Sequence, residues 1–278
     1  MLDLFHYEFF INALWASVFT AITCGIIGTY IVSRRIVFIS GGISHSCFGG
    51  LGIAYYLGIN PILGAAVFSV IASYVIEALS KKSELREDSL IGMMWSFGMA
   101  IGIIFVFLTP GYASDLMSYL FGSILTVSHF DILMMAILSL AIILVFILLY
   151  KEILFMAFDR EFAQTQRVPV SFISYVLITF IALTIVINIR VVGTIMVISL
   201  LTIPQATANI ISKNFRDIIF YSIGFAFLSN IIGLLASYYL NLPSGAAIIL
   251  FSIVIYGIVK AIHAIHVKTM LSKTLKTT

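Results

Sequence analysis

The sequence is poor in charge. Only 10% of its 278 residues are Asp, Glu, Lys or Arg, whereas an ordinary soluble domain has roughly 25%. Hydrophobic residues make up 62% of the chain, and the mean hydropathy is +1.16. A water-soluble globule of this size could not bury that much apolar surface. The composition also excludes a disordered chain and a nucleic-acid-binding protein, and it predicts an integral membrane protein.

Cysteine is nearly absent as well. Cys24 and Cys47 are the only two, and both lie in apolar runs without the spacing of a redox motif or a zinc finger. A disulfide-stapled scaffold is therefore excluded, and both thiols are expected to be small core residues. The first ten residues contain Asp3 and Glu8, where a cleavable signal peptide would be basic. We therefore expect the first apolar stretch to be a permanent span.

The signatures of several enzymes and carriers are missing from the sequence. It has no GxxxxGK[ST] phosphate loop, so the chain is not expected to hydrolyse nucleotides itself. It has no HExxH motif, and its 5 histidines are too few for a histidine-box enzyme. No apolar stretch holds the paired carboxylates of an intramembrane protease. Only Glu77 and Arg190 approach the buried charges of a proton-coupled carrier. These absences predict a transporter driven by a separate motor.

Apolar stretches run along the whole chain, each close to the roughly 20 residues that a helix needs to cross hydrocarbon. They predict an all-α, polytopic transmembrane helical bundle over residues 1–278, a single domain with about nine spans, or eight if one stretch does not cross. The stretches cover residues 9–33, 36–57, 61–80, 89–109, 130–150, 171–189, 191–211, 218–240 and 243–261.

The basic residues predict the orientation, because cytoplasmic loops are enriched in Lys and Arg. With the N-terminus outside and the C-terminus in the cytoplasm, only Arg190 of the 15 basic residues lies outside. The basic residues then on the cytoplasmic side are Arg34, Arg35, Lys81, Lys82, Arg86, Lys151, Arg160, Arg167, Lys213, Arg216, Lys260, Lys268, Lys273 and Lys276.

Two acidic residues mark the outer side of the predicted bundle. Residues 112–128 are apolar but too short to span beside their neighbours, so we expect a short interfacial or re-entrant helix near a cavity. Asp115 in this segment and Asp131 just after it either attract a cation to the outer mouth or cap a helix.

The second stretch combines glycine with an ionisable side chain. His45 lies near its middle, and an ionisable group at that depth marks a substrate path by default. The alternative is a neutral imidazole bonded to a carbonyl of an adjacent helix. Glycine weakens a helix but allows close packing or local unwinding. The five glycines of this stretch are Gly41, Gly42, Gly49, Gly50 and Gly52.

The longest predicted cytoplasmic connection covers about residues 151–170. Asp159 is placed to cap a short helix over residues 160–166, which Pro169 stops. Aromatic residues in an otherwise charged loop favour docking of a cytoplasmic partner, although a helix lying on the membrane surface would fit too. These aromatic residues are Phe155, Phe158 and Phe162.

Four segments together resemble the permease subunits of bacterial ATP-binding cassette (ABC) importers for zinc, manganese and iron. They are residues 38–46 around His45, residues 115–125 in the outer segment, residues 159–163 in the cytoplasmic connection, and residues 192–208 in a late helix with Gly193 and Pro204. The resemblance extends over essentially the whole chain.

This resemblance implies a transport subunit, not an enzyme, in the cytoplasmic membrane of a bacterium. It implies a homodimer, a cytoplasmic ATP-binding subunit and an extracytoplasmic metal-binding protein as partners. The divalent metal ion is the cargo, and no cofactor is permanently bound. His45 corresponds to the histidine of the family's metal-handling helix. The segment that would couple to the ATPase comprises Asp159, Arg160, Glu161, Phe162, Ala163, Gln164 and Thr165.

The sequence departs from the family at two positions. Gly41 stands where an aspartate is common, and Ser123 stands where many relatives have an acidic residue. Loss of carboxylate ligands favours zinc over manganese or iron, or leaves His45 as a transient contact. A motor-independent channel or carrier and an integral-membrane enzyme remain alternatives. The enzyme would pair His45 with His263 and His266, which we expect to be surface residues of the cytoplasmic end.

Overall fold

The computed structural model describes residues 7–82, 85–110, 122, 124 and 127–277, and within them the chain is helical without strands. The prediction of an all-α fold is therefore confirmed. The helices are α1 (Glu8–Ser33), α2 (Phe38–Tyr56), α3 (Pro61–Lys82), α4 (Glu87–Leu108), α6 (His129–Leu148), α7 (Tyr150–Phe158), α8 (Arg160–Thr165), α9 (Val170–Val192), α10 (Thr194–Leu200), α11 (Ile203–Ile211), α12 (Phe215–Leu240) and α13 (Ser244–Thr277).

Each predicted apolar stretch corresponds to a helix or to a broken helix. Eight of these segments are long and apolar enough to cross a membrane, with α10 and α11 counted together as Thr194–Ile211. The remaining one, α2, has 19 residues. Its glycines, its serines and His45 reduce its hydropathy, which explains why it does not reach the same criterion.

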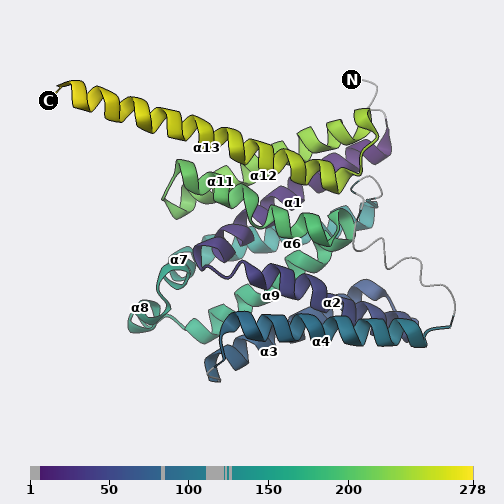
Figure 1. The fold of residues 1–278 in the computed structure, drawn as a ribbon. Coiled ribbons are helices and arrows are strands. Elements are labelled where there is room, and N and C mark those ends of the chain that lie inside the picture. Colours follow the sequence, from purple (N-terminus) through teal and green to yellow (C-terminus); the bar gives the residue numbers. More distant parts are fainter. Residues whose placement is uncertain (1–6, 83–84, 111–121, 123, 125–126, 278) are drawn as a thin grey trace.

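The helices run alongside one another, so the connections lie at two opposite ends (Figure 1). α7, α8 and the C-terminal end of α13 lie at one end, and the start of α1 lies at the other (Figure 1). α1 packs against α6, α9 and α12. α2 packs mainly against α3 and α4, and α9 contacts both α2 and α3. α9 therefore links the α2–α3–α4 group to the helices around α1.

Hydrogen bonds from amide side chains link three neighbouring helices to α1. Asn188 of α9 accepts a hydrogen bond from Thr20 at 2.9 Å. Gln205 of α11 donates to the Cys24 carbonyl at 2.8 Å, and Asn230 of α12 donates to the Ser17 carbonyl at 3.2 Å. Inside an apolar bundle such bonds stabilise helix pairs because a buried amide without a partner is costly.

The late helix is broken twice. Gly193 has a φ of +81° between α9 and α10, a conformation that side chains disfavour. A turn at Leu201 and Thr202 separates α10 from α11, and Pro204 stands in the first turn of α11. A Cβ at Gly122 would meet the backbone of Gly193, so Gly122 lies directly on the first break.

Candidate functional site

The imidazole of His45 is stacked on an aromatic ring of another helix. Its centroid lies 4.2 Å from that of Trp95 on α4, and the two ring planes differ by only 4°. Both side chains are half-buried. The stacking fixes the plane of the imidazole, whose edge is only partly accessible. Trp95 was missed by the sequence reasoning, since nothing in the order of residues pairs it with His45.

The Nδ1 atom of His45 is buried and has no hydrogen-bond partner among the described residues. The alternative of an imidazole bonded through this atom to a neighbouring carbonyl is therefore not observed. A neutral imidazole has one nitrogen that accepts, which is the atom that binds a divalent metal.

A closed metal cage is not built around His45. Within the residues that the structure describes, no three His, Cys, Asp or Glu side chains gather into a group that could hold a metal ion. The nearby Cys47 is buried, and its thiol donates to the Ser44 carbonyl at 2.9 Å. A single imidazole is weaker than the three or four ligands of a resident metal site, so the arrangement suits a brief contact with a passing ion.

Gly41 lies one helical turn before His45 and has room for a side chain. A Cβ placed there would lie 3.6 Å from Cζ3 of Trp95 and 3.9 Å from Cδ1 of Ile198 on α10. Both distances are ordinary van der Waals contacts. Tight packing therefore does not exclude a Cβ atom at position 41.

The other four glycines of α2 are closed to a side chain. A Cβ at Gly52 would lie 2.5 Å from the Gly102 carbonyl oxygen of α4, and one at Gly49 would lie 2.7 Å from the Phe68 ring of α3. Gly50 faces the backbone of Gly64 on α3, and Gly42 faces Ile91 on α4. These contacts bring α2 unusually close to α3 and α4, as small residues do between membrane helices.

The two acidic residues that the sequence predicted on the outer side have different outcomes. Asp115 and Ser123 lie outside the described residues. Asp131 closes a capping box with Ser128 at the start of α6 and forms an ion pair of 2.8 Å with Arg190. Of the two roles predicted for Asp131, helix capping is confirmed, and its carboxylate is already held by the guanidinium.

The short helix predicted in the connection over about residues 151–170 forms and ends one residue earlier, as α8. The carboxylate of Asp159 accepts a hydrogen bond from the Phe162 amide at 2.9 Å. Ala163 is fully buried against the bundle, whereas Phe162 and Phe158 are 46% and 64% exposed. The exposed face of α8 also includes Glu161, Gln164 and Thr165.

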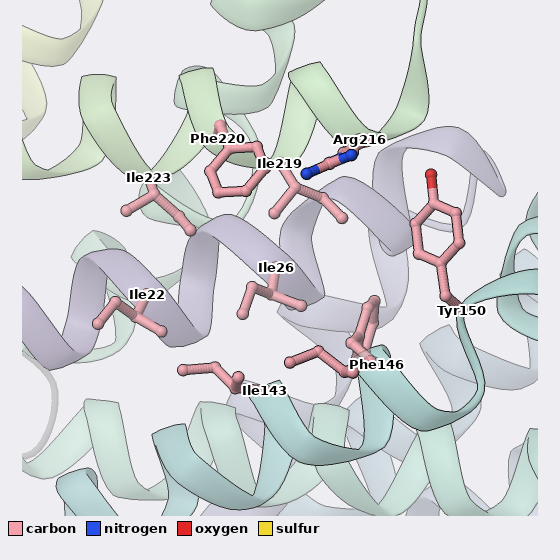
Figure 2. Close-up of a pocket in the computed structure, with 10 residues that line it drawn as sticks. Ile22, Ile26, Ile143, Phe146, Tyr150, Arg216, Ile219, Phe220 and Ile223 are labelled. Carbon is pink, nitrogen blue, oxygen red and sulfur yellow. The ribbon is translucent and has the colours of Figure 1, made fainter.

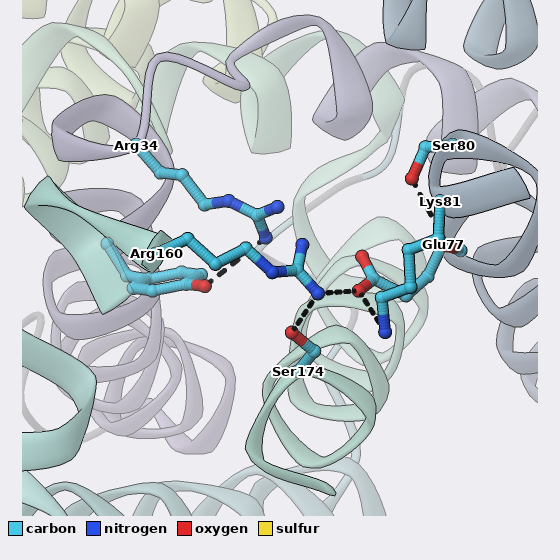
Figure 3. Close-up of polar contacts among 7 residues, drawn as sticks. Arg34, Glu77, Ser80, Lys81, Arg160 and Ser174 are labelled. Carbon is cyan, nitrogen blue, oxygen red and sulfur yellow. Dashed lines mark hydrogen bonds and ion pairs between the residues drawn. The ribbon is translucent and has the colours of Figure 1, made fainter. Parts of the chain in front are cut away.

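Arg160 turns away from this exposed face into the bundle (Figure 3). Its guanidinium lies 2.6 Å from the carboxylate of Glu77 on α3 and donates to the Ser174 hydroxyl on α9 at 3.1 Å. Lys81 reaches the same Glu77 oxygen at 2.9 Å. Glu77 is fully buried. Arg160 therefore anchors α8 to two spans, to α3 through the carboxylate of Glu77 and to α9 through the Ser174 hydroxyl.

Arg34, at the end of α1, lies beside this cluster (Figure 3). Burial alone would lower the pKa of Arg34, but attraction to Tyr30, Glu87 and Glu77 outweighs it and raises the pKa above its ordinary value. Arg34 therefore stays charged, and the cluster carries more positive than negative charge. The sequence reasoning noticed Glu77 but not its partners, because Arg160 is 83 positions away.

His263 and His266 are exposed on α13, as expected for surface residues. Both residues lie in the C-terminal half of α13. Neither belongs to the surroundings of His45 described above.

Comparison with known proteins agrees with this architecture. The profile of the ABC 3 transport family matches residues 6–263. An uncharacterized membrane protein of Synechocystis, slr2045, is 44% identical over 256 residues, covering 92% of this chain and 91% of that protein. The manganese transport system membrane protein MntC of Listeria monocytogenes is 35% identical, covering 92% and 91% of the two chains.

Among solved structures, PsaBC from Streptococcus pneumoniae in complex with Fab matches with a TM-score of 0.81 and 30% identity, covering 91% of each chain. An inward-facing conformation of a putative metal-chelate type ABC transporter matches with a TM-score of 0.70. Its 15% identity supports the fold alone. The chain belongs to the ABC 3 transport family, whose members are the permease subunits of ABC importers and not enzymes.

Proposed function

We propose that this chain is the membrane permease of an ABC importer that passes a divalent transition-metal ion into the cytoplasm. The observation that carries the proposal is the half-buried imidazole of His45, in the middle of a tightly packed helix. This imidazole lies flat on Trp95, and its buried Nδ1 atom has no hydrogen-bond partner among the described residues. Conduction requires a site weak enough to release its ion. A lone imidazole meets that requirement better than a cage.

The proposed topology has nine spans, with α2 as the ninth, in the cytoplasmic membrane of a bacterium. α2 qualifies despite its lower hydropathy because α3, α4, α9 and α10 contact it. Its glycines, serines and imidazole therefore face protein more than lipid. The positive-inside rule places the end with α7 and α8 in the cytoplasm.

The energy source in this proposal is a separate ATP-binding subunit that docks on α8. Exposed phenylalanines beside a buried anchor suit an interface whose motion must reach the membrane part. Arg160 and Glu77 join α8 to α3, which packs directly on α2. A tilt of α8 therefore has a short route to the helix of His45.

The proposal also includes a second copy of this chain and an extracytoplasmic binding protein that delivers the ion. A dimer would present two His45 residues to one path, and two imidazoles bind a cation better than one. The support is the family membership together with the lone imidazole of each chain.

The identity of the transported metal is the most detailed part of the proposal. Imidazole without a carboxylate favours zinc, and a Cβ atom at Gly41 would make only ordinary contacts. Relatives such as the Listeria protein carry manganese in their names. We therefore expect transport of a divalent first-row metal, with zinc and manganese as the two ions to compare.

The test measures metal uptake by proteoliposomes that contain the purified permease and its ATP-binding subunit. The metal-loaded binding protein is added outside. We expect ATP-dependent uptake of zinc or manganese that falls strongly with His45→Ala. The control His263→Ala changes an exposed imidazole and should transport normally. Uptake by the permease without the ATPase would refute the proposed energy source, and undiminished uptake by His45→Ala would remove that residue from the path.

A further inference from the structure

A long apolar groove lies on the outside of the bundle, between α6 and α12 (Figure 2). It has a volume of about 590 Å³, within the range of ligand pockets. α1 forms its floor, because α6 and α12 each pack on α1 and hardly touch each other in the described part of the chain. The lining side chains are Ile22, Ile26, Ile143, Phe146, Ile147, Tyr150, Arg216, Ile219, Phe220 and Ile223.

The two polar side chains of this groove lie at the same end. Figure 2 shows Arg216 and Tyr150 together at one end, with isoleucines and phenylalanines along the rest of the floor and walls. Arg216 stands in the first turn of α12, and Tyr150 begins α7 where the long α6 ends. Both positions are helix boundaries, so this end of the groove lies at the level where the spans meet the polar face of the membrane.

Arg216 has an exposed side chain, and none of the ion pairs between described residues uses its guanidinium. Its carbon Cζ lies 5.9 Å from the centre of the Phe220 ring, which directs the cation along the wall of the groove. Lys151, which follows Tyr150 in the sequence, is also exposed. Lys213 donates to the Asn209 carbonyl instead, and the acidic neighbours Glu152 and Asp217 are not among the residues that line the groove. This end therefore offers positive charge to an occupant whose body is apolar.

We propose that the groove holds one anionic phospholipid, with an acyl chain along Ile26 and Ile219 and the phosphate at Arg216. Basic pockets between membrane helices on the cytoplasmic side bind anionic headgroups in this way. The positive charge of Arg216 favours an anionic headgroup, and the apolar floor of the groove favours an acyl chain. That the lipid comes from the cytoplasmic leaflet rests on the proposed orientation; the binding site itself does not.

The experiment is native mass spectrometry of the purified full-length chain, titrated with phosphatidylglycerol or phosphatidylcholine in detergent. We expect one phosphatidylglycerol per chain to be retained in preference to phosphatidylcholine. Arg216→Gln should weaken phosphatidylglycerol roughly fivefold, the effect of one basic residue near a lipid surface. The matched control Lys213→Gln removes a neighbouring cation that bonds to the Asn209 carbonyl and should change little.

A second variant tests the apolar part separately. Ile219→Trp fills the groove on a lipid-facing wall and should reduce retention of both lipids, without altering the preference for charge. Equal retention of the two lipids by the parent chain would overturn the proposal, and so would an unchanged phosphatidylglycerol affinity of Arg216→Gln. Cysteines at Ile143 and Ile223 that cross-link two chains would instead assign the groove to a second copy. Because lipid retention is measured without transport, a failure here leaves the metal-uptake proposal intact, and the reverse also holds.

Discussion

At the scale of single residues, we expect the metal selectivity of the proposed path to depend on the side chains beside the imidazole of His45. His45 has an aromatic partner and no carboxylate partner in the part of the chain described by the structure. Gly41 lies on the same helical face, and a Cβ atom there would make ordinary contacts. A Cβ atom at Gly42 would instead collide with Ile91. Two adjacent glycines therefore have different roles, which makes position 41 the place to alter ligand chemistry.

We predict that Gly41→Asp shifts metal preference towards manganese. The new carboxylate, one turn from His45, adds the oxygen ligand that manganese prefers. A favourable interaction of about 1.4 kcal/mol would change the ratio of manganese to zinc uptake roughly tenfold. The measurement is competition between the two ions in the reconstituted uptake assay. Gly41→Asn, with the same shape and no charge, is the control, and an equal shift in both variants would show that the effect is steric.

The sequence could predict His45 but not its surroundings. An ionisable residue inside an apolar stretch is visible in the order of residues, because the bilayer penalises it. The stacking on Trp95 and the inward turn of Arg160 depend on which helices pack together, and a single sequence does not record those contacts. For the same reason the glycines of α2 were expected to pack closely, while their partners Gly64 and Gly102 were found only in the structure.

At the scale of helices, α8 matters because one buried carboxylate ties it to the bundle. Glu77 receives Arg160 from α8 and Lys81 from its own helix. Removing the carboxylate leaves two cations without their partner in a poorly solvated place. Breaking a fully buried pair costs about 3–5 kcal/mol. Arg160 and Lys81 are 26% and 29% exposed, so we expect a smaller loss of stability.

We predict that Glu77→Gln uncouples ATP hydrolysis from uptake while the ATPase subunit still co-purifies. The exposed face of α8 is unchanged by this substitution, but its anchor to α3 is weakened. Arg160→Gln should have a similar effect, and the double variant should lose less stability than the sum of the two, as interacting residues do. ATPase rate, metal uptake and thermal unfolding are measured on the same preparations.

The surface pair of Arg86 and Asp88 provides the control for that cycle. Its atoms are 2.9 Å apart, but the side chains are 84% and 64% exposed, and such pairs contribute little. Arg86→Gln should therefore leave stability and uptake nearly unchanged. If it uncouples the transporter as strongly as Glu77→Gln does, the buried carboxylate has no special part in coupling.

The helices themselves were the most predictable level of this protein. Hydropathy located every long segment because each span must bury its backbone polar groups in hydrocarbon. The short α8 was predictable from Asp159 and Pro169, since capping and helix termination are local effects. The sequence predicted one stretch over residues 191–211, whereas the structure breaks it at Gly193 and at Leu201–Thr202. The contact of Gly193 with Gly122 could not be predicted, because Gly122 comes from a distant part of the chain.

At the scale of the whole molecule, every proposed partner depends on which end faces the cytoplasm. The structure groups α7, α8 and the end of α13 on one side (Figure 1), and the basic loops lie with them. If this end is cytoplasmic, an ATP-binding subunit can reach α8 and a binding protein can reach the loop before α3. If it is not, neither partner can dock as proposed.

We predict that a cysteine at Asn60 reacts with a membrane-impermeant maleimide on intact cells, whereas one at Lys268 reacts only after permeabilisation. Asn60 is exposed between α2 and α3, and Lys268 is exposed on α13. The parent chain is the matched control, because its thiols at Cys24 and Cys47 are both buried and should stay unlabelled. Labelling of the Lys268 variant on intact cells would place α8 outside, away from ATP. The same result would move Arg216 to the outer leaflet while leaving its lipid preference unchanged, so the orientation and the groove can be judged independently.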